Sequence, residues 1–493
     1  MIRDLFQNII QKKDIRQNLV QLKALLNEGS NKYALLYQIG NDYAIFDELL
    51  AHEDAKIRKN TALIMGELAV PCFLEKLYET YQRETRLFVK SSYLKAMTNF
   101  DCTILLPDLK ARLSELGKFK IDEDNKKHIS EELRILSELI LDKEDIIRHT
   151  FVGYDVPSDL VLLTNRNFQY IIMEQLKGKK AQEFSAGVMV KTKNLKEIQS
   201  LRTYGELLFM LEDLKVCSDN VTTAAKTIAE SSLLAFMEKR HSGLAPFYFR
   251  IELKSMLELD KKSAFTKKLG FEVERLTNRS LINSTSNYEF ELRMIENKEG
   301  NYNILIKLYT LKDTRFSYRK NSIAASIQPV NAALMAALAK KYLMEDAQVL
   351  DPFCGVGTML LERCKLVPAN TMYGLDLYNE AINKAKENTE IAHAIIHYIN
   401  RDFFDFKHDY LFDEIFTNMP RAIGHKDEDE IFTLYQKFFA KAPEHLKNGA
   451  ILVLYSHDRD YIKRLINPKV YRIEQEYEIS RKEETYLFII RYL

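Results

Sequence analysis

The chain has 493 residues, of which 46% are hydrophobic and 29% charged, so it has the composition of a globular protein and the length of roughly two to four domains. The net charge is +1, no apolar run approaches the ~18 residues of a membrane helix, and charges occur too early for a signal peptide, so the cytoplasm is the expected compartment. The five cysteines form no Cys-x-x-Cys pair, which excludes a disulfide framework and a zinc finger, and we expect no metal.

The first part of the chain, residues 1–148, has helical periodicity throughout. Two stretches, EDAKIRKNTALIMGEL (53–68) and TRLFVKSSYLKAM (85–97), are weak copies of each other at an offset of 32 residues. They resemble HEAT repeats, in which stacked helix pairs bury an apolar stripe that one pair cannot bury alone. The prediction is a HEAT-like helical domain with a role in binding a protein partner left open, and a plain helical bundle is the alternative.

The second part, residues 149–318, has mixed α and β character. Strand patterns occur at 159–165, 185–192, 246–254, 287–295 and 302–310, with a helical pattern at 221–240. Residues 151–345 carry a net charge of about +7, whereas residues 346–493 carry about −5. If a polyanion binds, this middle part should attract it, although a solvated surface explains the same excess equally well.

The last part, residues 319–493, alternates between strands and helices. Strands are predicted at 347–352, 371–376, 396–400, 412–417, 449–455, 469–479 and 484–492, and helices at 358–366, 379–393, 429–446 and 458–466. Such alternation with short loops predicts an α/β, Rossmann-like parallel sheet. The last two strands are separated only by a short turn and should pair antiparallel, which resembles class I methyltransferases rather than dehydrogenases.

The residues Asp351-Pro-Phe-Cys-Gly-Val-Gly-Thr358 follow the first of these strands and open a helix. Gly355 and Gly357 allow the backbone to approach a ligand closely, and the helix N-terminus points its amides at polar groups. Asp376 ends the next strand, where a carboxylate is placed to accept ribose hydroxyls. Leu360 stands where a dinucleotide fingerprint needs its third glycine, so NAD is disfavoured.

The segment VLDPFCGVGTMLLERC resembles motif I of the S-adenosylmethionine-dependent methyltransferases that modify exocyclic amines of nucleic-acid bases, above all the RNA guanine-N2 methyltransferases that carry a THUMP domain. Three more segments resemble that family: 319–339 before motif I, INRDFFDF (399–406) and TNMP (417–420). The resemblance covers residues 319–493 strongly and reaches back through 151–318 only as a THUMP-like RNA-binding region. It therefore implies three domains: HEAT-like helical (1–148), α+β THUMP-like (149–318) and α/β methyltransferase (319–493).

The resemblance implies S-adenosylmethionine as cofactor and a set of site residues. The cofactor-binding residues it implies, with Asp402 accepting from the adenine amino group, are Ser326, Pro329, Asp351, Phe353, Gly355, Gly357, Thr358, Asp376, Leu377, Asp402 and Phe403. The catalytic residues it implies are Asn418, Met419, Pro420 and Arg421. The pair Phe403-Phe404 either covers the adenine or belongs to the core, and Cys354 is interpreted as a small loop residue rather than a nucleophile.

The TNMP segment suits the chemistry because an exocyclic amine is a poor nucleophile whose lone pair is delocalised into the ring. Asn418 Oδ1 and the Met419 or Pro420 carbonyl would each accept one N–H and aim the nitrogen at the methyl group. Arg421 departs from the family, which has an aromatic residue there. Its guanidinium can stack on a base, or the acceptor differs, or activity has been lost.

The sequence thus predicts a monomeric RNA methyltransferase acting on an exocyclic amine, guanine N2 in tRNA or rRNA first. RNA contacts are expected from Arg315, Arg319 and Lys320, which are interleaved with aromatic residues, with a solvated linker as the alternative. A methyltransferase acting on DNA or protein, and an RNA-binding scaffold with a vestigial methyltransferase domain, are the competing interpretations.

Overall fold

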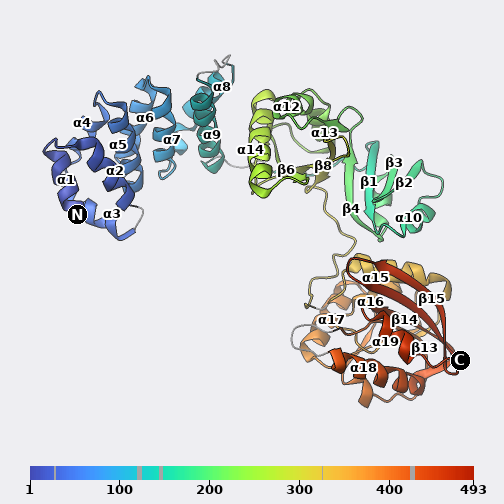
Figure 1. Cartoon of the computed structure of the whole chain (residues 1–493). Helices are drawn as coiled ribbons and strands as arrows, with labels where there is room; N and C mark the ends of the chain where they lie inside the picture. Colours follow the sequence, from blue (N-terminus) through green and yellow to red (C-terminus); the bar gives the residue numbers. More distant parts are fainter. Residues whose placement is uncertain (27–28, 119–124, 144–147, 325, 422–427) are drawn as a thin grey trace.

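The computed structural model describes the chain except for residues 27–28, 119–124, 144–147, 325 and 422–427. Three bodies follow one another along it (Figure 1): a helical array, an α/β region built on one sheet, and an α/β domain built on a second sheet. Within the described residues, no helix combines the length and apolarity needed to cross a membrane.

The N-terminal body is helical, as predicted. Its elements are α1 (Ile2–Ile10), α2 (Ile15–Leu25), α3 (Gly29–Ile39), α4 (Ala44–Leu50), α5 (Ala55–Leu68), α6 (Phe73–Arg83), α7 (Leu87–Met97), η1 (Thr103–Leu105), α8 (Leu106–Lys118) and α9 (Lys126–Lys143). The two similar segments form α5 and α7. These helices pack so closely at Gly66 that a Cβ there would lie 2.6 Å from the Ala96 Cα. Helix α7 packs in turn on α9, which agrees with a stacked repeat, while the HEAT assignment remains a prediction.

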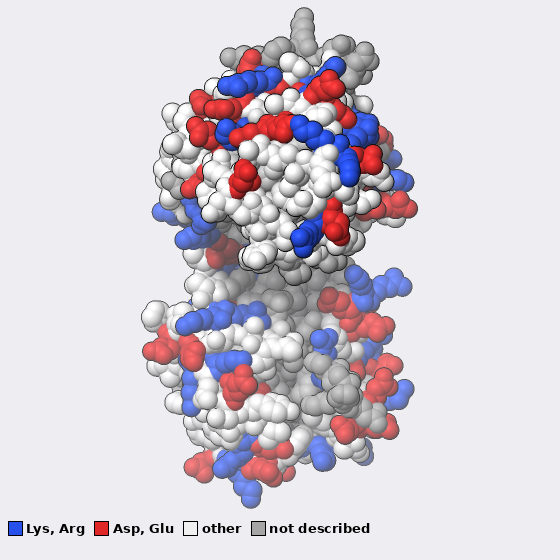
Figure 2. All heavy atoms as spheres, turned by 90° about the vertical axis from the view of Figure 1, so that its left-hand side faces the viewer, with Lys and Arg blue, Asp and Glu red and all other residues white. Residues whose placement is uncertain are grey.

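The surface of this body is shown end-on in Figure 2. Acidic and basic side chains are interspersed on this face rather than gathered by sign. On α9, at the opposite end of this body, the charges are paired as well, since Arg134 lies between Glu131 and Glu138, at 2.7 Å from each carboxylate. A face of mixed charges has no strong field of one sign, so it does not attract a polyanion at long range.

The middle body confirms each strand predicted for it. Its elements are β1 (Ser158–Thr164), α10 (Gln169–Gln175), β2 (Ala181–Phe184), β3 (Gly187–Thr192), α11 (Leu195–Ser200), β4 (Tyr204–Met210), β5 (Val216–Cys217), α12 (Val221–Ala229), α13 (Leu233–Arg240), β6 (Phe247–Lys254), α14 (Leu259–Leu276), β7 (Leu281–Asn283), β8 (Phe290–Glu296) and β9 (Tyr302–Leu308). The strands form one sheet in the order β2-β3-β1-β4-β9-β8-β6-β7, with β5 beside β9. Strands β2, β4, β5 and β7 were not predicted.

The helical pattern at 221–240 is two helices rather than one. Helix α12 ends at Ala229 and α13 begins at Leu233. Between them, the Asp213 carboxylate accepts hydrogen bonds from the Ser232 amide (2.7 Å) and the Ser232 hydroxyl (2.8 Å). Side-chain bonds to the backbone compete with helical ones, so the chain breaks at this point.

The C-terminal body confirms the predicted alternation. Its elements are α15 (Pro329–Ala339), η2 (Lys340–Tyr342), β10 (Gln348–Asp351), α16 (Thr358–Leu366), β11 (Thr371–Asp376), α17 (Asn379–Ile391), β12 (His397–Asn400), η3 (Phe403–Asp405), β13 (Phe412–Asn418), α18 (Glu428–Lys441), η4 (Ala442–His445), β14 (Leu446–Ser456), α19 (Arg459–Leu465), β15 (Tyr471–Ser480) and β16 (Thr485–Tyr492). The sheet order is β12-β11-β10-β13-β14-β16-β15, with β10 to β14 parallel and β16 antiparallel to both of its neighbours. The expected antiparallel hairpin at the end of the chain is therefore confirmed.

A buried carboxylate fixes the middle body to the C-terminal one. Glu362 lies on α16 with its side chain fully buried, and it accepts hydrogen bonds from Arg202 at 2.6 and 2.8 Å and from the Tyr318 hydroxyl at 2.6 Å. A second contact is made at β15, where the side-chain amide of Asn165 donates to the Ile479 carbonyl and Phe168 packs edge-on against Tyr477. Because α16 opens directly after the glycine loop, the first contact places the middle body relative to that loop.

Replacing Arg202 by Met should loosen this junction, because Glu362 would keep its buried charge and lose its cationic partner. Breaking such a pair costs roughly 3–5 kcal/mol when fully buried, and less here because Arg202 is 24% exposed. Hydrogen exchange measured by mass spectrometry should show faster exchange in α16 and residues 315–318. Arg134→Met, which removes an exposed arginine between two glutamates, should change exchange little. Equal protection of α16 in both variants would contradict this role for Arg202.

Candidate active site

A cavity of about 640 Å³ opens at the carboxyl ends of strands β10, β11 and β13. Parallel strands end at one edge of a sheet, so residues far apart in sequence meet there. The predicted site residues that line it are Ser326, Asp351, Phe353, Gly355, Thr358, Asp376, Leu377, Asp402, Phe403, Asn418, Met419, Pro420 and Arg421. Pro329 and Gly357 do not line it.

Asp351 ends β10 and is fully buried at the base of the cavity. Its Oδ1 accepts hydrogen bonds from the Phe353 amide and the Thr417 hydroxyl, whereas Oδ2 has no partner among the described residues. The pKa of this carboxyl is raised to about 7, chiefly by burial and to a smaller extent by the charge of Asp376, while the two hydrogen bonds oppose the rise. An unsatisfied buried oxygen on a cavity wall is suited to a ligand's N–H group.

Asp376, at the end of β11, organises the glycine loop. Its Oδ2 accepts from the Gly355 amide and its Oδ1 from the Tyr378 amide, both at 2.9 Å. Gly355 has φ +52°, and a Cβ there would meet only the tip of Ile323 at 3.9 Å, so this backbone borders open cavity. The loop is thus held in shape by the same carboxylate that was expected to bind ribose.

Gly357 is required for a different reason from the one expected. A Cβ at this position would lie 2.1 Å from the Tyr398 hydroxyl, and φ is +80°. Tyr398 is in turn held by Thr389, at 2.8 Å between the hydroxyl oxygens. The second glycine therefore admits the Tyr398 ring under the loop rather than a ligand above it. Pro329 begins α15 as its first residue and is buried.

The adenine end of the predicted site contains Asp402 and the Phe403-Phe404 pair. Asp402 lines the cavity and caps η3 by accepting from the Phe404 amide at 3.0 Å. Phe403 is 1% exposed and contacts both Phe353 and Phe438, so it is a core residue whose edge reaches the cavity. Phe404 is half-buried and lines the cavity as well.

The other end of the cavity is formed by the residues after β13. Asn418 is the last residue of β13. The backbone amide of the next residue, Met419, donates to the Tyr455 carbonyl of β14 at 2.8 Å, which fixes the backbone at this point. Arg421 is exposed, and its Nη1 lies 3.0 Å from Nε2 of His457. Burial and the charge of Arg421 lower the pKa of His457.

Several lining residues were missed at the level of sequence. They are Ile323, Gln328 and Asn331 before and within α15, and Tyr455, His457 and Glu483 from the β14 end and the β15–β16 turn. One signal was available for His457, because it follows a predicted parallel strand at the edge where ligands bind. The β15–β16 turn gave no such signal, since antiparallel hairpins place turns at either edge.

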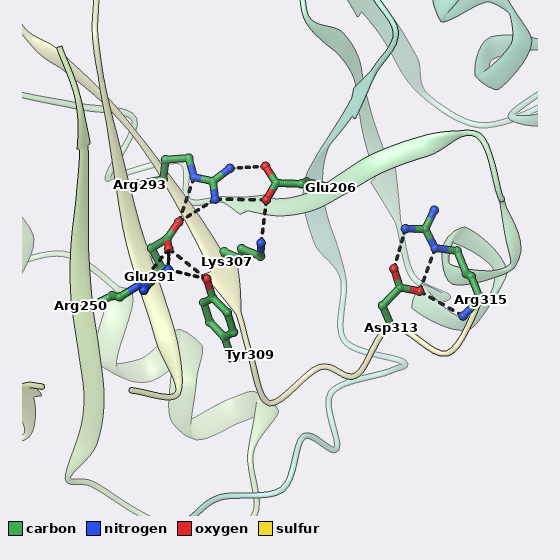
Figure 3. A network of polar contacts seen from close by, with 8 residues as sticks. All are labelled: Glu206, Arg250, Glu291, Arg293, Lys307, Tyr309, Asp313 and Arg315. Carbon is green, nitrogen blue, oxygen red and sulfur yellow. Dashed lines mark hydrogen bonds and ion pairs between the residues drawn. The ribbon is translucent and has the colours of Figure 1, made fainter. Parts of the chain in front are cut away.

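The three residues expected to contact RNA lie in different environments. Arg315 is 7% exposed and pairs with Asp313 (Figure 3), at 2.6 Å between the closest atoms. It also donates to the Leu201 and Tyr204 carbonyls and lies 3.6 Å from the centre of the Tyr204 ring. This guanidinium is fully engaged inside the protein, so its role is internal rather than in RNA contact.

Arg319 is half-buried and donates to the Ile327 carbonyl and, at 3.3 Å, to the Gln328 side chain, whereas Lys320 is exposed. The linker before α15 therefore combines one accessible cation with one that is partly held by the protein.

The central sheet of the middle body carries further cations, but they are paired. Figure 3 shows Arg293 between Glu206 and Glu291, with Lys307 beside Glu206 and Arg250 beside Glu291. The Lys307–Glu206 and Arg250–Glu291 ion pairs both have a nitrogen–oxygen distance of 2.6 Å. The two carboxylates thus pair with all three cations, and this cluster has a net charge of only +1. The positive excess of the middle part is therefore not concentrated on this face of the sheet.

Comparisons with known proteins agree with this geometry. Residues 317–483 match the family model described as "RMKL-like, methyltransferase domain", whereas no curated protein matches the chain. TrmN from Thermus thermophilus is similar over 68% of this chain and 99% of its own, with 19% identity and a TM-score of 0.53. A predicted N6-adenine-specific DNA methylase from Listeria monocytogenes is similar too, with 15% identity and a TM-score of 0.53 over 68% of this chain and 96% of its own. So is SMU.472, described as "a putative methyltransferase complexed with SAH", with 13% identity and a TM-score of 0.54 over 68% of this chain and 98% of its own.

Residues 317–483 thus form a methyltransferase-like domain, and the solved structures share the fold of about two thirds of the chain. The helical N-terminal region and the α/β C-terminal domain expected from the sequence are confirmed. The domain boundaries at residues 148 and 318 stay predictions.

The raised pKa of Asp351 predicts a pH-dependent gain in stability for Asp351→Asn. Below pH ~4 both folded and unfolded chains bind this proton, and between about 4 and 7 only the folded chain does, so stability falls as pH rises through that window. The Asn variant of the cofactor-free protein should therefore gain several degrees in Tm at pH 8 and little at pH 4, by scanning calorimetry. Exposed Asp405→Asn is the control. An equal shift at both pH values would contradict the assignment.

Proposed function

We propose that this protein transfers a methyl group from S-adenosylmethionine to an exocyclic amine of an RNA base, with N2 of guanine as the first candidate. The observation that carries the proposal is one cavity that joins three acidic strand ends to Asn418 and Pro420. A donor site and an amine-gripping site thereby share one cavity. Its volume is in the range of pockets that hold small molecules.

The donor site fits S-adenosylmethionine. Asp351 Oδ2 is an unpaired acceptor for an N–H of the cofactor, and the backbone at Gly355 leaves room beside it. The Asp376 carboxylate accepts two backbone amides, but each oxygen has a second lone pair for a ribose hydroxyl. When bound, the cofactor supplies a methyl group on a positively charged sulfur, which is already reactive.

The acceptor site acts by orientation. Asn418 Oδ1 accepts one N–H of the exocyclic amine and a main-chain carbonyl of Met419 or Pro420 accepts the other, which returns electron density to the nitrogen. These carbonyls are preorganised because the Met419 amide is bonded to Tyr455. Proton loss follows methyl transfer, so the site needs no strong base. A flipped base reaches Asn418 through the mouth that Arg421 borders.

RNA is the proposed acceptor because the sequence motifs resemble those of RNA guanine-N2 methyltransferases. In addition, the middle body, which we propose to be THUMP-like, is held through Glu362 to α16, the helix whose first residue lines the cavity. The tRNA or rRNA would be held there and by the linker cation Lys320. DNA is the second candidate, since one structural neighbour is named as a DNA adenine methylase. A scaffold with a vestigial site is the third, and calorimetry with S-adenosylhomocysteine tests it: absence of binding would favour the scaffold.

The test is transfer of a labelled methyl group to total tRNA, rRNA or DNA, followed by nucleoside mass spectrometry. We expect N2-methylguanosine in RNA and no label in DNA. Label in N6-methyladenine of DNA would overturn the RNA assignment.

Asn418→Ala should lower kcat by about a hundredfold or more, because the amine loses an orienting acceptor. Binding of S-adenosylhomocysteine, measured by calorimetry, should be unchanged, since the donor lies at the acidic strand ends. Asn370→Ala removes an exposed amide in the loop before β11 and is the matched control. Activity of the Asn418 variant equal to that of this control would refute the role of Asn418.

A further inference from the structure

Two residues outside the donor site meet at the acceptor end of the cavity. Arg421 comes three residues after Asn418, and His457 follows the last residue of β14. Strands β13 and β14 are neighbours, with Asn418 opposite Tyr455, so the residues that leave the two strands lie side by side. Arg421 Nη1 and His457 Nε2 are 3.0 Å apart, and both side chains line the cavity.

The contacts of His457 select one neutral tautomer. Its Nδ1 lies 3.2 Å from the carbonyl oxygen of Glu483, and a carbonyl can only accept, so Nδ1 carries the hydrogen. Nε2 then has a free lone pair, which accepts from the permanently charged guanidinium. The imidazole thus bridges the β15–β16 turn and Arg421, and it takes one of the donors of Arg421 without neutralising its charge.

We propose that His457 is a positioning residue that holds the plane of Arg421 so that the guanidinium stacks on the methyl-accepting base. The inference rests on the proposed function, because it assigns the base-stacking group of that same site. A guanidinium is planar and stacks on bases as an aromatic ring does, whereas an exposed arginine without a partner samples many rotamers. His457 therefore replaces, by a hydrogen bond, the rigidity that an aromatic side chain has by itself.

The pair should work only while His457 is neutral. Protonated histidine has no lone pair for Arg421 and repels it. The charged groups facing His457 are Arg421 from the β13–α18 loop, Asp458 at the start of α19 and Glu483 from the β15–β16 turn. Burial and Arg421 lower the pKa of His457, while the two carboxylates oppose this. Acceptor binding should therefore weaken as pH falls below the ordinary histidine range.

The kinetic test compares His457→Phe with His457→Gln. The Phe variant should raise KM for the acceptor RNA about tenfold, the order of one lost stacking contact, with KM for S-adenosylmethionine unchanged. Gln keeps an acceptor for the guanidinium and should stay close to the wild type. Only the wild type should show the rise in acceptor KM at acid pH. Equal KM values for the wild type and the Phe variant would overturn the proposal.

A double-mutant cycle separates stacking from a general structural effect. Arg421→Tyr supplies a ring that needs no partner, so adding His457→Phe to it should change nothing further. Arg421→Lys keeps the charge but not the plane and should behave like His457→Phe. Additive effects in the cycle would overturn the proposal. So would an Arg421→Lys variant with wild-type KM and steeper salt dependence, which would indicate a phosphate contact instead.

A readout without turnover distinguishes this inference from the proposed function. In protein with ¹⁵N-labelled histidine, the His457 signal, assigned with the Gln variant, should report the Nδ1–H tautomer, and its pKa should rise in Arg421→Tyr. If the wild type methylates no nucleic acid, the proposed function fails and stacking fails with it, while the tautomer still reports on the pair. A mixture of tautomers that Arg421→Tyr does not change would overturn the pairing itself.

Discussion

The buried carboxylate of Glu362 is the constraint that ties the middle body and the linker to the domain that holds the site. It lies one turn into α16, the helix that the glycine loop opens, and it binds Arg202 and Tyr318 from the middle body and the linker. Arg202 also donates to the Arg315 carbonyl and lies over the Phe316 ring, so a single arginine ties the linker to the helix. A buried charge tolerates few alternative positions, because each one leaves it without a partner. The proposed RNA-binding region is therefore placed relative to the cofactor loop by this ion pair together with the apolar contacts of Phe168 and Ile171 with the C-terminal core.

The donor side of the cavity is organised before any ligand enters. Asp376 holds the Gly355 amide, Tyr398 fills the space under Gly357, and the Asn388 side chain bonds the Val356 carbonyl from below. Within this framework, Asp351 Oδ2 and Thr358 Oγ1 are buried oxygens of cavity-lining residues without a partner among the described residues. A buried polar atom without a partner calls for an explanation, and at a cavity wall a ligand that supplies the missing hydrogen bond is one.

The acceptor side is built differently, from main-chain carbonyls and a long cationic side chain. The Tyr455 carbonyl fixes the Met419 amide, and His457 engages Arg421 from the same strand end. Strand β14 thus positions both the group proposed to grip the amine and the group proposed to stack on its ring. An arginine in a place that resembles an aromatic position in related motifs is compatible with activity once a partner restricts its plane.

The sequence by itself determined the helical N-terminal region, the strand–helix alternation after residue 345 and the acidic strand ends at Asp351 and Asp376, because periodicity, glycines and strand tips are local signals. Only the tertiary structure decided what Arg315, Gly357 and His457 do. Arg315 lies in a segment whose sequence predicts an exposed, basic surface. The carbonyls that accept its hydrogen bonds nevertheless belong to Leu201 and Tyr204, more than 100 positions away. Gly357 is required because the Tyr398 ring occupies the space of a Cβ, and His457 acquires its role from contacts with Arg421 and with Glu483 in the last hairpin. A local pattern carries no information about such neighbours, since they are set by how the sheet and its loops pack.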